Sequence, residues 1–154
     1  MAEQSVSLEL LQPGQKLARG VSRMLRTLDF ACLEEFTPDR GKRVDVMALG
    51  PKGELWVVEC KSSRADFRSD RKWTGYLDYC DRYFWAVDAT FPVDLLPEAT
   101  GLIFADSYDA EIRRMPEQSA LAAPRRKVLT RKFARAAALR LQGARDPDAV
   151  LHNG

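Results

Sequence analysis

Residues 43–61, RVDVMALGPKGELWVVECK, decide the fold expected for this chain. Two runs rich in valine and leucine flank the tetrapeptide GPKG, and this Gly/Pro cluster predicts the turn of a β-hairpin. One register of that hairpin pairs Leu49 with Leu55 across a loop of five residues. In this register Asp45 lies directly opposite Glu59, whereas a shift of one residue would place Asp45 on the other face.

Two carboxylates side by side in an apolar hairpin need a physical reason, because like charges repel across a ladder and buried charge is costly. A divalent cation would remove both costs, since carboxylate and carbonyl oxygens are the usual ligands of Mg²⁺. Lys61 could then hold a water or a phosphate oxygen beside the cation. The alternative is a structural ion pair in which Lys61 neutralises Glu59. The residues alone leave both interpretations open.

The hairpin and the segment after it resemble a known family. Asp45, followed after a hairpin by Glu59-Cys60-Lys61, resembles the signature of the PD-(D/E)XK nuclease superfamily. A longer pattern more specifically resembles the MmcB-like bacterial DNA repair family. That pattern consists of ECKSSRADF (residues 59–67), DRKW (residues 70–73) and YLDYCDR (residues 76–82).

The resemblance implies a fold and a site. The fold would be α/β, a restriction-endonuclease-like core with a mixed central β-sheet flanked by helices, in the order αβββαβ plus extra strands and a C-terminal helix. Asp45, Glu59 and the backbone carbonyl of Cys60 would bind Mg²⁺ (or Mn²⁺), and Lys61 would lie at the attacking water. The implied activity is DNA repair by metal-dependent phosphodiester hydrolysis, as an endonuclease or exonuclease, with Asp45, Glu59 and Lys61 catalytic.

One departure from the superfamily pattern bears on activity. Many relatives add an acidic residue from the first helix to the metal site, but residues 15–28 contain no Asp or Glu. A cation held by only two carboxylates binds weakly. Two other functions therefore stay open. One is a DNA-binding repair accessory of the same fold that does not cleave, and the other is a protein-interaction module with Asp45, Glu59 and Lys61 as a structural charge cluster.

Basic residues are concentrated near the end of the chain. Residues 125–145 carry eight basic residues and no acid, which leaves 16 of the 24 basic residues against 22 acidic ones elsewhere. Such a segment is typical of a contact with a phosphate backbone or of a solvated helix face. The candidate nucleic-acid-binding residues elsewhere in the chain are Arg19, Arg23, Arg43, Arg64, Arg68, Lys72 and Tyr76.

Composition narrows the classes of function. The single histidine, His152, lies in the C-terminal tail, which argues against Ser-His-Asp or Cys-His catalysis and against Cys/His zinc sites. The chain has no glycine-rich phosphate loop, so an NTPase or a dinucleotide enzyme is not expected. No apolar run is long enough to span a membrane, and the N-terminus lacks the pattern of a signal peptide. We therefore expect a cytoplasmic protein. The resemblance implies DNA as its partner, and other repair proteins or a second copy of the chain are further candidate partners.

Length and periodicity predict one domain over residues 13–144, with a flexible arm at 1–12 and a flexible tail at 145–154. The expected helices are residues 15–29, 62–81 (broken near Trp73) and 125–141. The expected strands beside the hairpin are residues 30–36, 83–87, 101–105 and 110–114, with a polar turn at 37–42.

Overall fold

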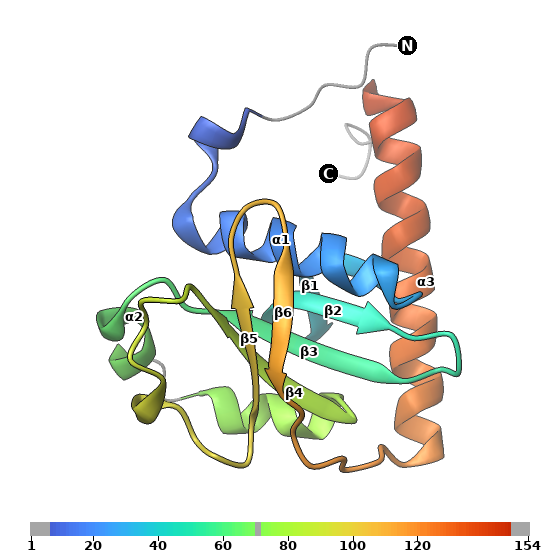
Figure 1. Ribbon diagram of the computed structural model, residues 1–154. Helices are drawn as coiled ribbons and strands as arrows, with labels where there is room; N and C mark the ends of the chain where they lie inside the picture. The colour runs from blue at the N-terminus through green and yellow to red at the C-terminus, as the bar shows by residue number, and fades with distance from the viewer. Residues whose placement is uncertain (1–6, 70–71, 149–154) are drawn as a thin grey trace.

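The structure, a computed structural model, describes residues 7–69 and 72–148, without the side chains of Asp66, Arg68 and Ser69. Six strands form one sheet with helices on both faces (Figure 1). The strands are β1 (Ala31–Asp39), β2 (Lys42–Leu49), β3 (Leu55–Cys60), β4 (Arg82–Val87), β5 (Gly101–Ala105) and β6 (Ala110–Arg114). The helices are α1 (Pro13–Thr27), α2 (Arg64–Ser69) and α3 (Ala123–Arg145), with short 3₁₀ helices η1 (Leu8–Leu10), η2 (Trp73–Tyr79) and η3 (Val93–Leu95).

The strands lie in the sheet in the same order as in the chain. The pairs β1–β2, β2–β3 and β5–β6 are antiparallel, whereas β3–β4 and β4–β5 are parallel. Parallel neighbours need a crossover, and the segments that contain α2, η2 and η3 provide it. The expected α/β class, with a mixed sheet and a C-terminal helix, is confirmed.

The hairpin of β2 and β3 has the register expected from the sequence. Leu49 pairs with Leu55 and Val46 pairs with Val58, so Asp45 and Glu59 are the next opposed positions. Gly53 closes the turn with a φ of 88°, a left-handed conformation that favours glycine.

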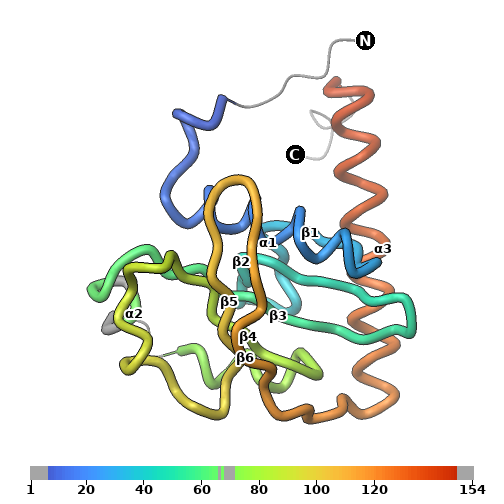
Figure 2. The backbone as a smooth tube through the Cα atoms, viewed as in Figure 1, coloured from blue at the N-terminus to red at the C-terminus, as the bar shows by residue number. Residues whose placement is uncertain are grey.

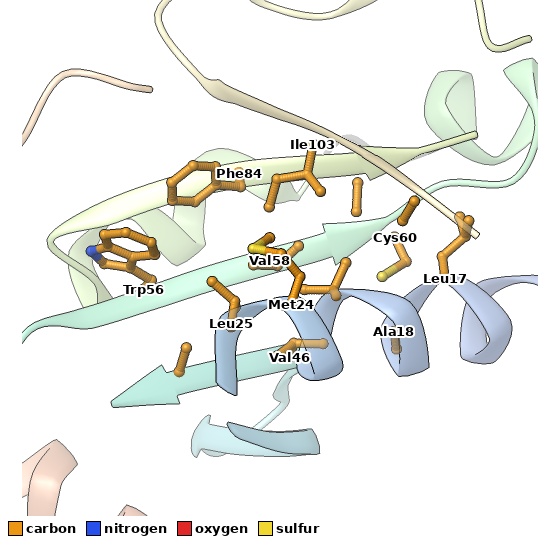
Figure 3. Packing of buried hydrophobic residues seen from close by; sticks show 14 of the residues in the cluster. Leu17, Ala18, Met24, Leu25, Val46, Trp56, Val58, Cys60, Phe84 and Ile103 are labelled. Atoms are coloured by element: carbon orange, nitrogen blue, oxygen red, sulfur yellow. The ribbon is translucent and has the colours of Figure 1, made fainter. Parts of the chain in front are cut away.

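The first core cluster lies between α1 and the sheet (Figure 3). Residues of α1 at helical spacing contribute one side, and alternate residues of the central strands contribute the other. The labelled members are Leu17, Ala18, Met24, Leu25, Val46, Trp56, Val58, Cys60, Phe84 and Ile103. Leu28, which has the same spacing, lies beyond the end of α1 and is 47% exposed.

The second core cluster lies on the opposite face of the sheet, under α3 and η2. Met47, Val57 and Trp85 contribute from the strands, and Leu129 and Phe133 contribute from α3. The two clusters together bury both faces of the central strands, which explains their nearly continuous apolar sequence.

The buried carboxylate of Asp81 connects α3 to the sheet. It accepts hydrogen bonds from the backbone N–H groups of Leu55 (2.8 Å) and Leu121 (2.9 Å). Arg126 donates to both of its oxygens, at 2.7 and 2.5 Å. Burial alone would raise the pKa of Asp81, but these hydrogen bonds outweigh it and hold that pKa below its ordinary value.

Three expected boundaries differ from the structure. Residues 37–39 continue β1 rather than form a turn, because Phe36 pairs with Val44 and Asp39 pairs with Lys42. The helix expected over residues 62–81 is instead α2 and the separate η2. The C-terminal helix extends four residues past the expected end, to Arg145. Within the described residues, none of the helices has the length and apolarity that crossing a membrane would require.

Candidate functional site

The two carboxylates of the hairpin contact each other's strand. The Asp45 N–H donates to Glu59 Oε1 at 3.0 Å, and the Cys60 N–H donates to Asp45 Oδ2 at 2.7 Å. Glu59 is only 6% exposed, whereas Asp45 is half-buried. These hydrogen bonds fix both carboxylates at the end of the hairpin, next to the backbone of Cys60.

The side chains of β2 change their facing at Asp45. Val44 belongs to the core cluster under α3, whereas Val46 belongs to the cluster under α1. Residues two apart in a regular strand share a face, so the strand changes its facing at Asp45.

Burial and proximity change the acidity of the pair. Burial, and secondly the negative charge of Asp45, raise the pKa of Glu59 to about 9, although the Asp45 N–H opposes the rise. Glu59 therefore holds a proton near neutral pH in the metal-free protein. A bound cation would offset the cost of ionising Glu59, because its positive charge would stabilise the carboxylate form.

Lys61 extends from the end of β3 on the same side as Glu59. Its Nζ lies 5.9 Å from the centre of the Trp85 ring, and its positive charge lowers the pKa of Glu59. The structure therefore brings Asp45, Glu59, Cys60 and Lys61 together, as the sequence predicts.

A cavity of about 440 Å³ adjoins Asp45, between the first turns of α1 and the strands β1 and β2. Arg19 is also in its wall, and its guanidinium donates to the Ser107 carbonyl at 2.6 Å and lies 5.5 Å from the centre of the exposed Tyr108 ring. Figure 2 shows the β5–β6 connection beside α1. The cavity is lined by Leu11, Gly14, Gln15, Ala18, Arg19, Glu34, Glu35 and Asp45.

Sequence reasoning missed Glu34 and Glu35, which bring two further carboxyl groups from β1 to the cavity that Asp45 lines. Partial loss of solvent and the charge of Glu35 raise the pKa of Glu34, while the charge of Arg140 opposes the rise. Glu35 has a left-handed backbone with φ of 50°, which is uncommon outside glycine. The sequence did contain a signal, the two adjacent acids in the otherwise apolar strand expected over residues 30–36. Because neighbouring residues of a strand face opposite sides, one of the two acids would be expected to face the interior.

The other predicted nucleic-acid-binding residues lie apart from this cavity. Arg23 is exposed on α1, Arg43 on β2, Arg64 at the start of α2 and Lys72 before η2. Tyr76 packs against the core under α3, with the Lys42 Nζ 5.4 Å from its ring centre. The side chain of Arg68 lies outside the described residues. Among the described residues of the predicted set, Arg19 alone lines the cavity with Asp45.

The donor chemistry fits a hard cation only in part. Asp45, Glu59 and the Cys60 carbonyl offer the oxygen ligands that Mg²⁺ prefers. Within residues 7–69 and 72–148, however, no three Asp, Glu, His or Cys side chains are grouped so that they could hold a metal ion. Two carboxylates and one carbonyl are therefore the donors that this hairpin itself provides.

Comparison with known proteins gives two matches. The profile of a family described as DNA repair protein MmcB-like matches residues 5–148. A solved structure, the SPO1766 protein of unknown function from Silicibacter pomeroyi, is 65% identical to this chain and superposes with a TM-score of 0.88. The similarity covers 90% of this chain and 95% of that one. A search of proteins with curated descriptions found no match. Since the family profile spans nearly the whole sequence, the chain belongs to the MmcB-like family of DNA repair proteins.

Proposed function

We propose that this protein acts in DNA repair as a metal-dependent phosphodiesterase with a PD-(D/E)XK-type site. The observation that carries the proposal is the pairing of the buried Glu59 with the half-buried Asp45, fixed beside the Cys60 backbone by two hydrogen bonds. A chain gains nothing in stability from burying two carboxyl groups against each other, so a ligand that offsets the cost is the natural explanation. Mg²⁺ or Mn²⁺ held by Asp45, Glu59 and the Cys60 carbonyl meets that requirement.

Each residue would have a separate task. The cation, when bound, would acidify a water and stabilise negative charge on the phosphate. Asp45 and Glu59 would hold it, and Glu59 would give up its proton when it does so. Lys61 would orient the attacking water or a phosphate oxygen, and Arg19 in the cavity wall would hold a neighbouring phosphate of the DNA.

The test is cleavage of single-stranded, duplex, flapped and four-way DNA in Mg²⁺, Mn²⁺ and EDTA by the wild type, Glu59→Gln and Glu98→Gln. Glu98 is an exposed control outside the site. We expect metal-dependent cleavage that falls by on the order of 100-fold or more in Glu59→Gln and is unchanged in Glu98→Gln. Cleavage that survives in Glu59→Gln, or that persists in EDTA, would contradict the proposal.

A DNA-binding accessory that does not cleave is the second candidate. The absence of a third grouped carboxylate within the described residues favours it, because two carboxylates hold Mg²⁺ weakly. It predicts no cleavage of any substrate, together with salt-sensitive DNA binding that the wild type and Glu59→Gln share. A homodimer and contacts with other repair proteins stay predictions from the sequence.

A further inference from the structure

The helix α3 has two basic faces with different roles. Its inward face carries the buried Leu129 and Phe133. The basic residues that flank them donate to the protein itself. Arg126 binds Asp81 and the Gly53 carbonyl, Lys132 binds the Pro38 carbonyl, and Arg140 binds the carbonyls of Glu34 and Glu35.

The outward face carries basic residues that the fold does not use. At 100° per residue, Lys127, Arg131, Arg135 and Arg145 lie on the side of α3 away from Leu129, and all four are exposed. Within the described part of the chain, none of them has an acidic side chain at ion-pair distance. The residues between them on this face are Ala134, Ala138 and Gln142, so the face carries cations and no acidic residue.

A helix face of this kind carries an electrostatic cost. Lys127, Arg131 and Arg135 follow one another at intervals of four residues, and like charges at this spacing destabilise a helix. The inward residues already fix α3 to the sheet, so the outward charges are not needed for folding. A polyanionic partner would turn the cost into a gain in binding free energy.

We propose that this outward face of α3 binds the phosphate backbone of duplex DNA, as a contact separate from the Asp45 cavity. The inference rests on the proposed function only in taking DNA as the partner. Lys127 and Arg145 lie at the same angle about the helix axis, five turns or roughly 27 Å apart, and Arg131 and Arg135 lie between them within about 80° of that angle, so the four cations form a row along one side of the helix. A duplex presents one phosphate charge about every 1.7 Å along its axis and can match such a row.

Two features of α3 favour DNA over an anionic membrane and make the contact separable from the site. Helices that bind membranes insert a stripe of large apolar side chains, whereas the exposed apolar residues of α3, Val128, Leu139 and Leu141, lie on either side of this face and not between its cations. In addition, α3 packs on one face of the sheet, whereas α1, which lines the Asp45 cavity, packs on the other.

The experiment measures affinity of the full chain for a short fluorescent duplex in EDTA, over a range of NaCl concentrations. The variant is Lys127→Gln/Arg131→Gln/Arg135→Gln, which keeps residues of good helix propensity. The control is Arg26→Gln/Arg40→Gln/Lys52→Gln, which removes three exposed charges elsewhere and gives the same net charge. We expect the slope of log affinity against log salt to flatten by about 2–3 in the α3 variant and by less than about 1 in the control.

Three outcomes overturn the inference. One is an unchanged slope in the α3 variant, the second is an equal loss in both variants, and the third is loss of binding to phosphatidylserine vesicles with duplex binding intact. Circular dichroism verifies that the helix is retained.

The cleavage assay with Glu59→Gln distinguishes failure of this inference from failure of the proposed function. If Glu59→Gln cuts normally while the slope depends on α3, the nuclease site is wrong and the α3 contact stands. If Glu59→Gln is inactive and the slope does not depend on α3, the reverse holds.

Discussion

The substitution Asp81→Asn tests how α3 is held on the sheet. Each carboxylate oxygen of Asp81 accepts one backbone N–H and one Arg126 N–H. Asparagine has the same shape but replaces one oxygen by an NH₂ group, which faces two donors and can accept from neither. The variant therefore loses one backbone hydrogen bond, one bond from Arg126 and the negative charge.

These losses set the expected magnitude. A charge-assisted hydrogen bond contributes about 1.5–3 kcal/mol, and a buried N–H left without an acceptor costs about 1–3 kcal/mol. The side chain of Arg126 is 31% exposed, so solvent recovers part of its loss. We expect Asp81→Asn to lower the free energy of unfolding by about 3 kcal/mol, which corresponds to a fall in Tm of roughly 10 °C.

Urea denaturation followed by far-UV circular dichroism measures this difference, with the exposed neighbour Asp78→Asn as the control. The pH dependence gives an independent readout. The pKa of Asp81 is lower in the folded protein than its ordinary value of 3.8, so its stabilisation is present above pH 3.8 and is lost as the pH falls through the folded value. Asp81→Asn should lack this acid-dependent loss. A cost below about 1 kcal/mol, or an acid response equal to that of the wild type, would refute the reasoning.

Three further predictions concern the site and its frame. Glu59→Gln should stabilise the metal-free protein by up to about 3 kcal/mol near neutral pH, with no gain below pH 4.5. The reason is that the folded pKa of Glu59, about 9, makes the wild type lose stability as the pH rises from 4.5 towards 9. Urea titrations in EDTA at several pH values measure this difference, and a gain independent of pH contradicts it. Added Mg²⁺ should raise the Tm of the wild type more than that of Glu59→Gln, since a ligand of the native state stabilises by mass action, and equal shifts would remove Glu59 from the ligand set. Gly20→Ala should lower stability by about 1–3 kcal/mol because its Cβ would lie 1.9 Å from the Asp106 carbonyl oxygen, whereas Gly14→Ala, whose Cβ would have no neighbour nearer than the Cys60 carbonyl oxygen at 4.0 Å, should be neutral or stabilising.

The hairpin could be predicted from the sequence because its information is local. The GPKG turn limits the loop length, and the register with Leu49 opposite Leu55, expected from the sequence, is the one that the structure has. From that register the proximity of Asp45, Glu59 and Lys61 follows without knowledge of the rest of the fold. The two core clusters are similarly accessible, since they repeat the periods of a helix and of a strand.

The unpredicted parts depend on contacts between segments distant in the chain. The polar residues Thr37 and Asp39 have turn propensity, yet pairing with β2 keeps them in β1. The cavity wall combines α1 with Glu34 and Glu35, and no local pattern reports that α1 covers that end of the sheet. The ring of Tyr76 packs on the core under α3, a contact that no local pattern reports.

The contacts between α3 and β1 also cover part of an edge of the sheet. β1 is an edge strand that pairs only with β2, and an uncovered edge can recruit a strand from another molecule. Arg140 occupies the carbonyls of Glu34 and Glu35, Lys132 occupies that of Pro38, and proline has no N–H to offer an incoming strand. The C-terminal helix thus works as a cap on the sheet, and a chain that loses it would present a free edge to other molecules.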